Sequence, residues 1–303
     1  MTTVLIAGAT GMLGGLIAGH LLDQGGVDVR LLVRGSARSD AGKAAAIEAL
    51  VSRGATSVPG DVTDASSLDE ATRGVDVVVS ALQGGPDIIV GGQIALAEAA
   101  VRNGVRRFIP SDFALDLFAA PAGAPQFDMR RTADAAIDAM PLEVVHVLNG
   151  AFMDMMTDPE TAGIVNLQNA TARIWGTGDE PFNLTTVDDT ARFTANLATD
   201  PADLGGVRAV SGAETTFNKI IAEAERLTGK AFTVNVAGSA EDLRRITAGA
   251  EDPWSVIMPW YVLSMITVPP FAVTDNDRYP HLTLTTLDDH LAAQHRAAGQ
   301  PRP

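Results

Sequence analysis

The chain begins with a buried strand, a glycine-rich turn and a helix, in that order. An apolar run over residues 3–7 leads into glycines at 8, 11 and 14, and an apolar helical pattern covers 12–22. The first glycine of such a turn allows a sharp bend, the second admits a phosphate close to the backbone, and the third lets helix and strand pack closely. Free N–H groups at the helix N-terminus then favour anions.

This turn is predicted to hold the pyrophosphate of a dinucleotide. The alternative is a purely structural turn in an α/β domain that binds no nucleotide. The position of the turn, after one strand, before one helix and inside a βαβ unit, favours the nucleotide site. The residues expected at the pyrophosphate are Gly8, Thr10, Gly11, Met12, Leu13 and Gly14.

Short apolar runs and helical patterns alternate through the first half of the chain. Residues 75–80 contain four valines and one aspartate, which is typical of a strand buried on both faces. Strict alternation at this spacing predicts an α/β fold, a Rossmann-type doubly wound parallel sheet with right-handed crossovers. Strands are expected at 3–7, 28–33, 56–58, 75–80, 107–110 and 142–148, and helices at 12–22, 41–53, 66–73, 93–102 and 127–140.

The second half is less regular and predicts a smaller C-terminal α+β lobe. Strands are expected at 173–175, 182–187 and 232–236, and helices at 188–197, 215–228 and 286–296. No shift in composition marks a linker. We therefore expect residues 1–155 to form the dinucleotide-binding domain and residues 156–303 a substrate-binding lobe packed on it.

Basic residues follow the second predicted strand, where the identity of the dinucleotide is usually decided. An NAD-selective site ends this strand with a carboxylate that binds the ribose 2′-hydroxyl. Here the strand ends in Arg34, followed by Arg38 and Lys43. Cations there pair with the 2′-phosphate of NADPH. A solvated basic loop is the alternative, but in so acidic a chain the clustering favours NADPH.

Two further strand ends supply candidate cofactor contacts. Asp61 and Val62 follow the third strand and are expected beside the adenine, although Asp61 equally well caps a turn. Ala81, Leu82 and Gln83 follow the fourth strand and are expected along the cofactor ribose, with an ordinary loop as the alternative.

Charge and composition exclude several classes of function. The net charge is −15 and there is no basic run, which argues against nucleic acid and anionic membranes as partners. Cysteine is absent, so disulfides and thiolate sites are impossible and a cytoplasmic location is expected. The five histidines show no metal-binding spacing, so no metal is expected. His146 lies in a predicted buried strand and is interpreted as a hydrogen-bonded core residue.

Several segments together resemble the NmrA-like group of atypical short-chain dehydrogenases, which includes isoflavone reductases and phenylcoumaran benzylic ether reductases. The resemblance covers nearly the whole chain and is strongest over residues 1–155. The segments that carry it are GATGMLGG at 8–15, VRGSARSDAGK at 33–43, VVVSALQG at 77–84, RFIPSDFALD at 107–116, FDMRR at 127–131, NGAFMD at 149–154 and DNDRYP at 275–280.

The resemblance implies roles for particular positions. It assigns the NADPH 2′-phosphate to Arg34 and Lys43, and it runs the segment from Pro110 through Ser111 and Asp112 to Phe113 past the nicotinamide. It also places residues 149–152 beside the nicotinamide and the substrate pocket. Asn149 and Gly150 are expected to contact the cofactor, and Phe152 with the adjacent Met153 to line the substrate pocket. A homodimer is the expectation from the family.

The chain departs from the family pattern at one catalytic position. Plant-type reductases carry a lysine where this chain has Arg130. Arginine stays protonated and cannot abstract a proton, but it can donate to ribose hydroxyls or to a developing oxyanion. The Tyr-x-x-x-Lys pair of ordinary short-chain dehydrogenases is also missing, because neither Tyr261 nor Tyr279 has a lysine four residues later.

Two functions follow from these features. The first is an NADPH-dependent oxidoreductase that transfers hydride to a small, fairly apolar carbonyl, quinone or conjugated substrate; a quinone suits a site without a base. The second is a non-catalytic dinucleotide sensor that acts through a protein partner. The first is favoured, and substrate-dependent loss of NADPH absorbance discriminates between them.

Overall fold

The computed structural model describes residues 1–157 and 164–298, and the chain divides into two compact units. The first unit comprises residues 1–113, 128–147 and 190–208, and the second comprises 114–127, 148–189 and 209–303. The units therefore interleave along the sequence, whereas the sequence pattern predicts a single boundary at residue 155. The assignment of cofactor and substrate to separate domains stays a prediction.

A seven-stranded sheet forms the first unit, in the order β11-β6-β5-β4-β1-β2-β3. Strands β1 to β6 pair in parallel, which confirms the predicted Rossmann-type fold. The strands are β1 (Thr2–Ala7), β2 (Val27–Val33), β3 (Thr56–Pro59), β4 (Val77–Ser80), β5 (Arg107–Ile109), β6 (Glu143–Leu148) and β11 (Gly206–Ala209).

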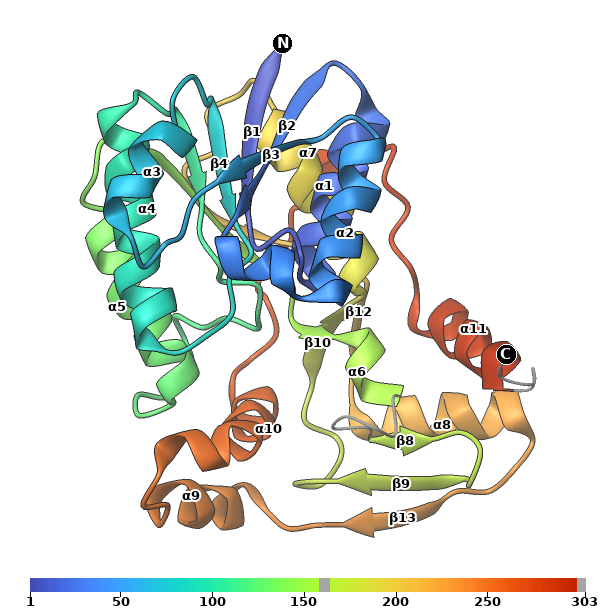
Figure 1. Ribbon diagram of the computed structural model, residues 1–303. Helices are drawn as coiled ribbons and strands as arrows, with labels where there is room; N and C mark the ends of the chain where they lie inside the picture. Colours follow the sequence, from blue (N-terminus) through green and yellow to red (C-terminus); the bar gives the residue numbers. More distant parts are fainter. Residues whose placement is uncertain (158–163, 299–303) are drawn as a thin grey trace. The chain divides into compact units, whose positions relative to one another are not determined.

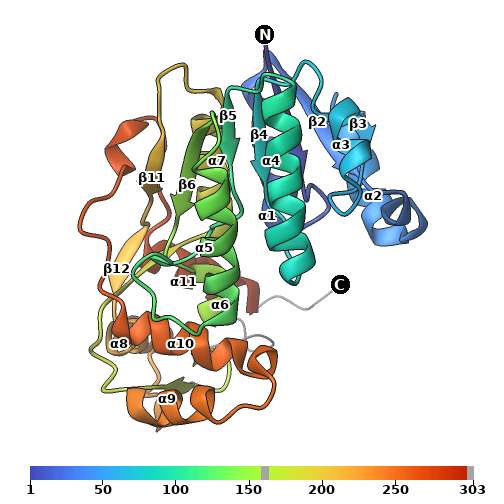
Figure 2. The same ribbon diagram turned by 90° about the vertical axis from the view of Figure 1, so that its left-hand side faces the viewer.

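Helices cover both faces of this sheet. Helices α3, α4 and α5 lie on one face and α1, α2 and α7 on the other (Figures 1 and 2). The regular helices are α1 (Met12–Gln24), α2 (Ala41–Ser52), α3 (Ala65–Ala71), α4 (Gln93–Arg102), α5 (Pro125–Ile137) and α7 (Val187–Thr199). A short 3-10 helix at Gly35–Ser39 precedes α2, and a π-helical turn at Asp87–Gly92 precedes α4. The central strands are apolar and fully buried because helices cover them from both sides.

Side-chain caps define where several helices begin. Asp40 caps α2 by accepting from the Lys43 N–H, and Asp64 caps α3 by accepting from the Ser66 N–H. Helix α1 differs, because its cap is Gly11, which has no side chain to offer. The uncapped end of α1 lies at the predicted phosphate site.

The second unit contains two three-stranded sheets and five helices among the described residues. Its strands are β7 (Ala151–Phe152), β8 (Val165–Asn166), β9 (Thr171–Ile174), β10 (Phe182–Thr185), β12 (Ala213–Thr215) and β13 (Thr233–Val236). The sheets have the orders β12-β10-β7 and β13-β9-β8. The helices are α6 (Met153–Thr157), α8 (Phe217–Thr228), α9 (Ala240–Ala248), α10 (Ile257–Thr267) and α11 (Leu287–Ala298), with short 3-10 turns at Pro253–Val256 and Asn276–Arg278.

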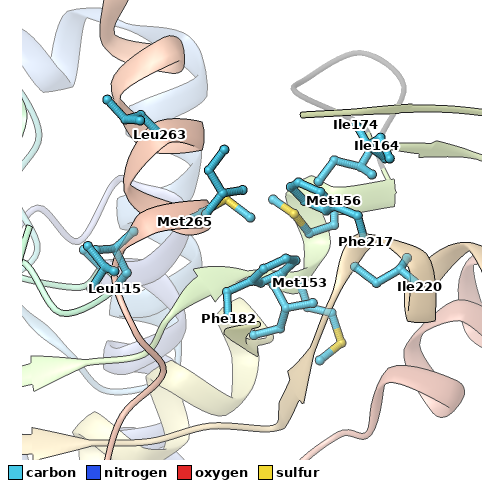
Figure 3. Close-up of a cluster of buried hydrophobic side chains, with 14 of the residues drawn as sticks. Leu115, Met153, Met156, Ile164, Ile174, Phe182, Phe217, Ile220, Leu263 and Met265 are labelled. Carbon is cyan, nitrogen blue, oxygen red and sulfur yellow. The ribbon is translucent and has the colours of Figure 1, made fainter. Parts of the chain in front are cut away.

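Methionine, phenylalanine and aliphatic side chains from several elements form the core of the second unit (Figure 3). Phe182 of β10 packs against Phe217 of α8 with ring centroids 5.0 Å apart. Met153 is completely buried in the same cluster. Among the described residues no helix has the length and apolar character needed to cross a bilayer.

Candidate functional site

The glycine turn after β1 packs backbone against backbone. Gly8 has a φ of +92°, and a Cβ built on it would lie 2.3 Å from the Ala81 carbonyl oxygen at the end of β4. A Cβ on Gly14 would lie 2.4 Å from the Gly8 oxygen, whereas one on Gly11 would meet that atom at 3.3 Å. Gly8 and Gly14 therefore bring α1, β1 and β4 together, as predicted for a dinucleotide turn.

The N-terminus of α1 is suited to an anion. The Gly11 cap provides no side-chain hydrogen bond, and the first turn contains no acidic residue. The first backbone N–H groups of a helix have no intrahelical acceptor, so the N–H groups at Met12 and Leu13 are available to a ligand. Thr10 is half-buried and Met12 is exposed beside them. This arrangement fits the pyrophosphate of a dinucleotide.

The loops that follow β4 and β5 are hydrogen-bonded to each other. The Ser111 hydroxyl donates to the Leu82 carbonyl oxygen at 2.7 Å, and the Ser111 N–H donates to the buried Gln93 side chain of α4 at 2.8 Å. Ala81 is tied to β1 through its N–H and the Ala7 oxygen at 2.8 Å. The structure therefore gathers the predicted ribose and nicotinamide segments at the carboxyl edge of the sheet, where ligands of doubly wound folds bind.

The remaining residues of those two loops border this edge. Gln83 is exposed, Pro110 is buried and Phe113 is half-buried.

A cationic surface follows β2. Arg34 is exposed at the end of the strand, and Lys43 in the first turn of α2 is partly exposed, with its ammonium group 3.6 Å from the Asp40 carboxylate. The 3-10 turn Gly35–Ser39 contains Arg38, whose side chain lies outside the described part of the structure. Arg34 and Lys43 are thus accessible to a ligand phosphate.

Asp61 lies after β3, close to this cationic surface. Its carboxylate accepts from the Thr63 N–H at 3.0 Å and from the Thr63 hydroxyl at 2.8 Å. These hydrogen bonds, and to a lesser degree the charge of Arg34, lower the pKa of Asp61. The structure thus shows the turn-capping role, and Val62 beside it is buried. Contact of either residue with adenine stays a prediction.

Arg130 of α5 is directed at the carboxyl edge of the sheet. Its Nε donates to the Ser111 carbonyl oxygen at 2.8 Å, and the side chain is half-buried. A guanidinium here donates hydrogen bonds and contributes positive charge, but it does not accept a proton. The chemistry that this position supports is therefore stabilisation of negative charge or orientation of a hydroxyl.

Three carboxylates, two of them buried, surround His146 in the first unit. Its Nδ1 lies 2.7 Å from Asp112 Oδ2, and its Nε2 lies 3.0 Å from Asp138 Oδ1. Asp134 is buried beside them. His146 is hydrogen-bonded in a buried strand, as interpreted from the sequence.

Sequence spacing did not reveal this cluster, because it assembles from the loop after β5, from α5 and from β6. One signal was present: Arg130, Asp134 and Asp138 recur every four residues, which places them on one helix face.

Four predicted site residues belong to the second unit. Asn149 is fully buried, and neither its amide oxygen nor its amide nitrogen has a hydrogen-bond partner among the described residues. Gly150 has a φ of +72°, and a Cβ on it would lie 2.2 Å from the Asn183 oxygen. Phe152 is half-buried, whereas Met153 is buried in the hydrophobic core. The unsatisfied amide of Asn149 fits a polar ligand, and the four assignments remain predictions.

The second unit also contains a small, mostly apolar pocket. Leu115, Gly150, Phe182, Met265 and Phe271 are among its lining residues. The backbone N–H of Phe271 donates to the Asn183 side chain at 2.7 Å, which fixes one part of the lining. Gly150, predicted from the sequence to contact the cofactor, therefore lies beside an apolar pocket of the same unit.

Comparison with known proteins agrees with this geometry. The sequence model of the NmrA-like family matches residues 1–279. Pinoresinol reductase 1 from Arabidopsis thaliana is 30% identical over 241 residues, covering 76% of this chain and 75% of its own length. Eugenol synthase 1 from Petunia hybrida is 26% identical, covering 95% of this chain and 97% of its own.

A solved structure extends the likeness to three dimensions. The protein AtPrR2, in complex with NADP+ and (+)-pinoresinol, superimposes with a TM-score of 0.81 at 25% sequence identity, covering 96% of this chain and 98% of the other.

Proposed function

Because the chain belongs to the NmrA-like family, we propose that it is an NADPH-dependent reductase of a small, fairly apolar carbonyl, quinone or conjugated compound. The observation that carries the proposal is the dinucleotide turn of Gly8, Gly11 and Gly14 with exposed Arg34 and Lys43 after β2. The relative named as a reductase and the neighbour that holds NADP+ and (+)-pinoresinol support the cofactor and a small organic substrate.

Different residues of the chain are expected to bind the cofactor phosphates and to stabilise charge on the substrate. NADPH supplies the hydride when it is bound. The uncapped N-terminus of α1 is expected to bind the pyrophosphate, and Arg34 with Lys43 the 2′-phosphate. Arg130 donates hydrogen bonds toward the sheet edge and stabilises the negative charge that develops on the substrate after hydride transfer.

Three finer assignments belong to the same proposal. Phe152 and Met153 are the proposed substrate contacts, and the apolar pocket that the neighbouring Gly150 and Ala151 help to line is the proposed substrate cavity. The working location is the cytoplasm, in keeping with the absence of cysteine. The assembly is a homodimer, as expected from the family.

Substitution of both cations tests the cofactor assignment. In the R34A/K43A variant, NADPH binding is expected to weaken about 100-fold and NADH binding by less than about twofold, because only NADPH carries the 2′-phosphate. Calorimetric titration of the purified protein with each cofactor measures both constants.

A matched variant separates local contacts from net charge. R73A/R102A removes two exposed cations of the first unit that pair with Glu70 and Asp69. It is expected to bind both cofactors like the parent protein. Equal loss of NADPH and NADH binding in R34A/K43A would contradict the 2′-phosphate assignment.

Turnover decides between the reductase and the sensor. NADPH absorbance is followed with a panel of quinones and aromatic carbonyl compounds. Oxidation of NADPH that depends on one compound supports the reductase. Tight NADPH binding with no turnover across the panel would favour the dinucleotide sensor instead.

A further inference from the structure

Helix α5 and the residue that follows it present three ionisable side chains along one face, at four-residue spacing. Arg130 donates to the Ser111 carbonyl oxygen, and Asp138 lies 3.0 Å from His146 Nε2. Asp134 lies between them in sequence, and the Asp138 N–H donates to the Asp134 carbonyl oxygen at 2.7 Å, so the helical turn continues. At one end of this face, Arg130 binds the segment after β5. At the other end lies the half-exposed carboxylate of Asp138.

His146 holds the carboxylate of Asp112 in the segment that follows β5. Asp112 is fully buried, and the His146 side chain is only 5% exposed. Burial alone would lower the pKa of His146, but the hydrogen bond to Asp112 and then the charge of Asp112 outweigh it and raise that pKa to about 9. The imidazole is thus cationic at neutral pH and bridges two carboxylates.

The carboxyl group of Asp134 is buried and has no hydrogen-bond partner among the described residues. The residue is 2% exposed, and among the described residues neither of its carboxyl oxygens forms a hydrogen bond; the same is true of Asp112 Oδ1. Burial first, and then the charge of Asp112, raise the pKa of Asp134 to about 8. The charged groups that face it are Asp112, His146, Asp138 and Arg130.

One proton, bound to the carboxyl group of Asp134, reduces the repulsion between the buried carboxylates of this cluster. A carboxyl oxygen from Asp112, one from Asp134 and a ring nitrogen of His146 all lie within 4.8 Å of one another. A protonated Asp134 provides an O–H donor where unpaired carboxylate oxygens would otherwise repel. Both ring nitrogens of His146 are already at hydrogen-bond distance from carboxylates, so a proton fits the cluster better than a divalent cation.

We propose that Asp134 and His146 are positioning residues of the reductase site: Asp134 controls whether Arg130 stays on the Ser111 carbonyl, and His146 fixes Asp112. This inference rests on the proposed function. Residues four apart on a helix are neighbours, so an ionised Asp134 attracts the Arg130 guanidinium along α5 and away from Ser111. Loss of the Asp134 proton therefore disorganises the segment that is expected to border the nicotinamide.

The test is the pH dependence of NADPH affinity, measured by calorimetry at pH 7 and pH 9.5. Wild-type protein is expected to bind NADPH about tenfold more weakly at pH 9.5, the change that corresponds to one pKa unit. D134N cannot ionise, so at pH 9.5 it is expected to bind about tenfold more tightly than the wild type. D69N, an exposed substitution on α3, is the matched control and should follow the wild type.

A second measurement reports the cluster without the cofactor. The chain has five histidines, so the His146 ring signals in a proton NMR spectrum can be assigned by comparison with H146Q. Their titration midpoint is expected above pH 8 in the wild type. A midpoint near the ordinary value of about 6.5 would overturn the proposal.

The outcomes separate this inference from the proposed function. If the wild type binds no NADPH at pH 7, the proposed function itself fails. If it binds NADPH equally at both pH values, or if D134N shows the same alkaline loss, only the positioning role fails. Calorimetric binding of Zn²⁺ or Mn²⁺ to the wild type that D134N abolishes would replace the proton with a metal ion and overturn the inference.

Discussion

Gly8 combines a left-handed backbone with close contact to another strand. Its φ is +92°, and an added Cβ would lie 2.3 Å from the Ala81 backbone oxygen, which cannot move without displacing β4. G8A is therefore expected to lower the free energy of unfolding by about 3–5 kcal/mol, because strain and steric overlap act together. Urea denaturation followed by circular dichroism measures the change.

Gly104 provides the control for backbone strain alone. It has a φ of +72° at the end of α4, with nothing within 4 Å of an added Cβ. G104A is expected to cost about 1–2 kcal/mol, the ordinary penalty for a left-handed non-glycine residue. If both variants lose the same stability, contact with Ala81 contributes nothing.

At the scale of single residues, the sequence predicted backbone roles better than side-chain partners. The glycine turn has a fixed spacing because its function lies in the backbone. Asp112 was predicted only as part of a segment that resembles the family, and its partner His146 only as a buried histidine. Their contact depends on how β5, β6 and α5 pack, which no local spacing records.

Arg107 connects β5 to the end of α7 in the first unit. This side chain is completely buried and pairs with Glu143 Oε1 at 2.6 Å. It also donates to the carbonyl oxygens of Leu197, in the last turn of α7, and of Asp200 and Ala202, which follow the helix. The guanidinium thereby holds the segment after α7 against the sheet.

Replacement of this arginine is expected to be strongly destabilising. R107M should lower the free energy of unfolding by about 3–5 kcal/mol, because it removes the buried cation that pairs with Glu143 Oε1 and takes the side-chain donor away from the carbonyl oxygens of Leu197 and Ala202. R106M is the matched control, since Arg106 pairs with the same carboxylate but is 44% exposed, and it should cost less than about 1 kcal/mol. Equal costs in thermal or urea unfolding would show that burial of Arg107 is unimportant.

At the scale of elements, periodicity located the long segments of the first half but missed the short strands and, in the second half, helix α10. Every predicted strand and helix of the first half is present with its ends shifted by a few residues. Strands β7, β8, β11 and β12 were not predicted, because runs of two to four residues carry too little periodic pattern. Helix α9 was also missed, although Ser239 and Asp242 form a capping box at its start.

At the scale of the whole molecule, the buried cluster makes stability depend on pH. The pKa of Asp134 is raised from 3.8 to about 8 and that of His146 from 6.5 to about 9. At each pH between a group's ordinary pKa and its raised pKa, the folded state therefore binds more protons than the unfolded state. The free energy of unfolding consequently falls as pH rises through this range. From pH 6.5 to pH 9 we expect a fall of about 2–4 kcal/mol.

Urea denaturation at several pH values measures this fall. D134N removes the contribution of Asp134, so its stability should fall less and should exceed that of the wild type at pH 9. A stability that rises over this range would show that the cluster is deprotonated in the folded protein.

Fold class and family were predictable from the sequence, because both are encoded in patterns that extend over the chain. The division into units was not, because it depends on contacts between distant segments. Residues 190–208 belong to the first unit although they follow residue 155, and Arg107 with its carbonyl partners is one physical reason.

This interleaving has a consequence for biosynthesis. A nascent chain leaves the ribosome from its N-terminus, and domains generally fold as units as they emerge. The first unit lacks α7 and most of edge strand β11 until residue 208 of 303 has been made. Residues 114–127 and 148–189 belong to the second unit, and the residues that complete this unit, 209–303, are synthesised later. The dinucleotide-binding sheet is therefore completed only late in translation, and until then the growing chain exposes apolar surface to the chaperones of the cell.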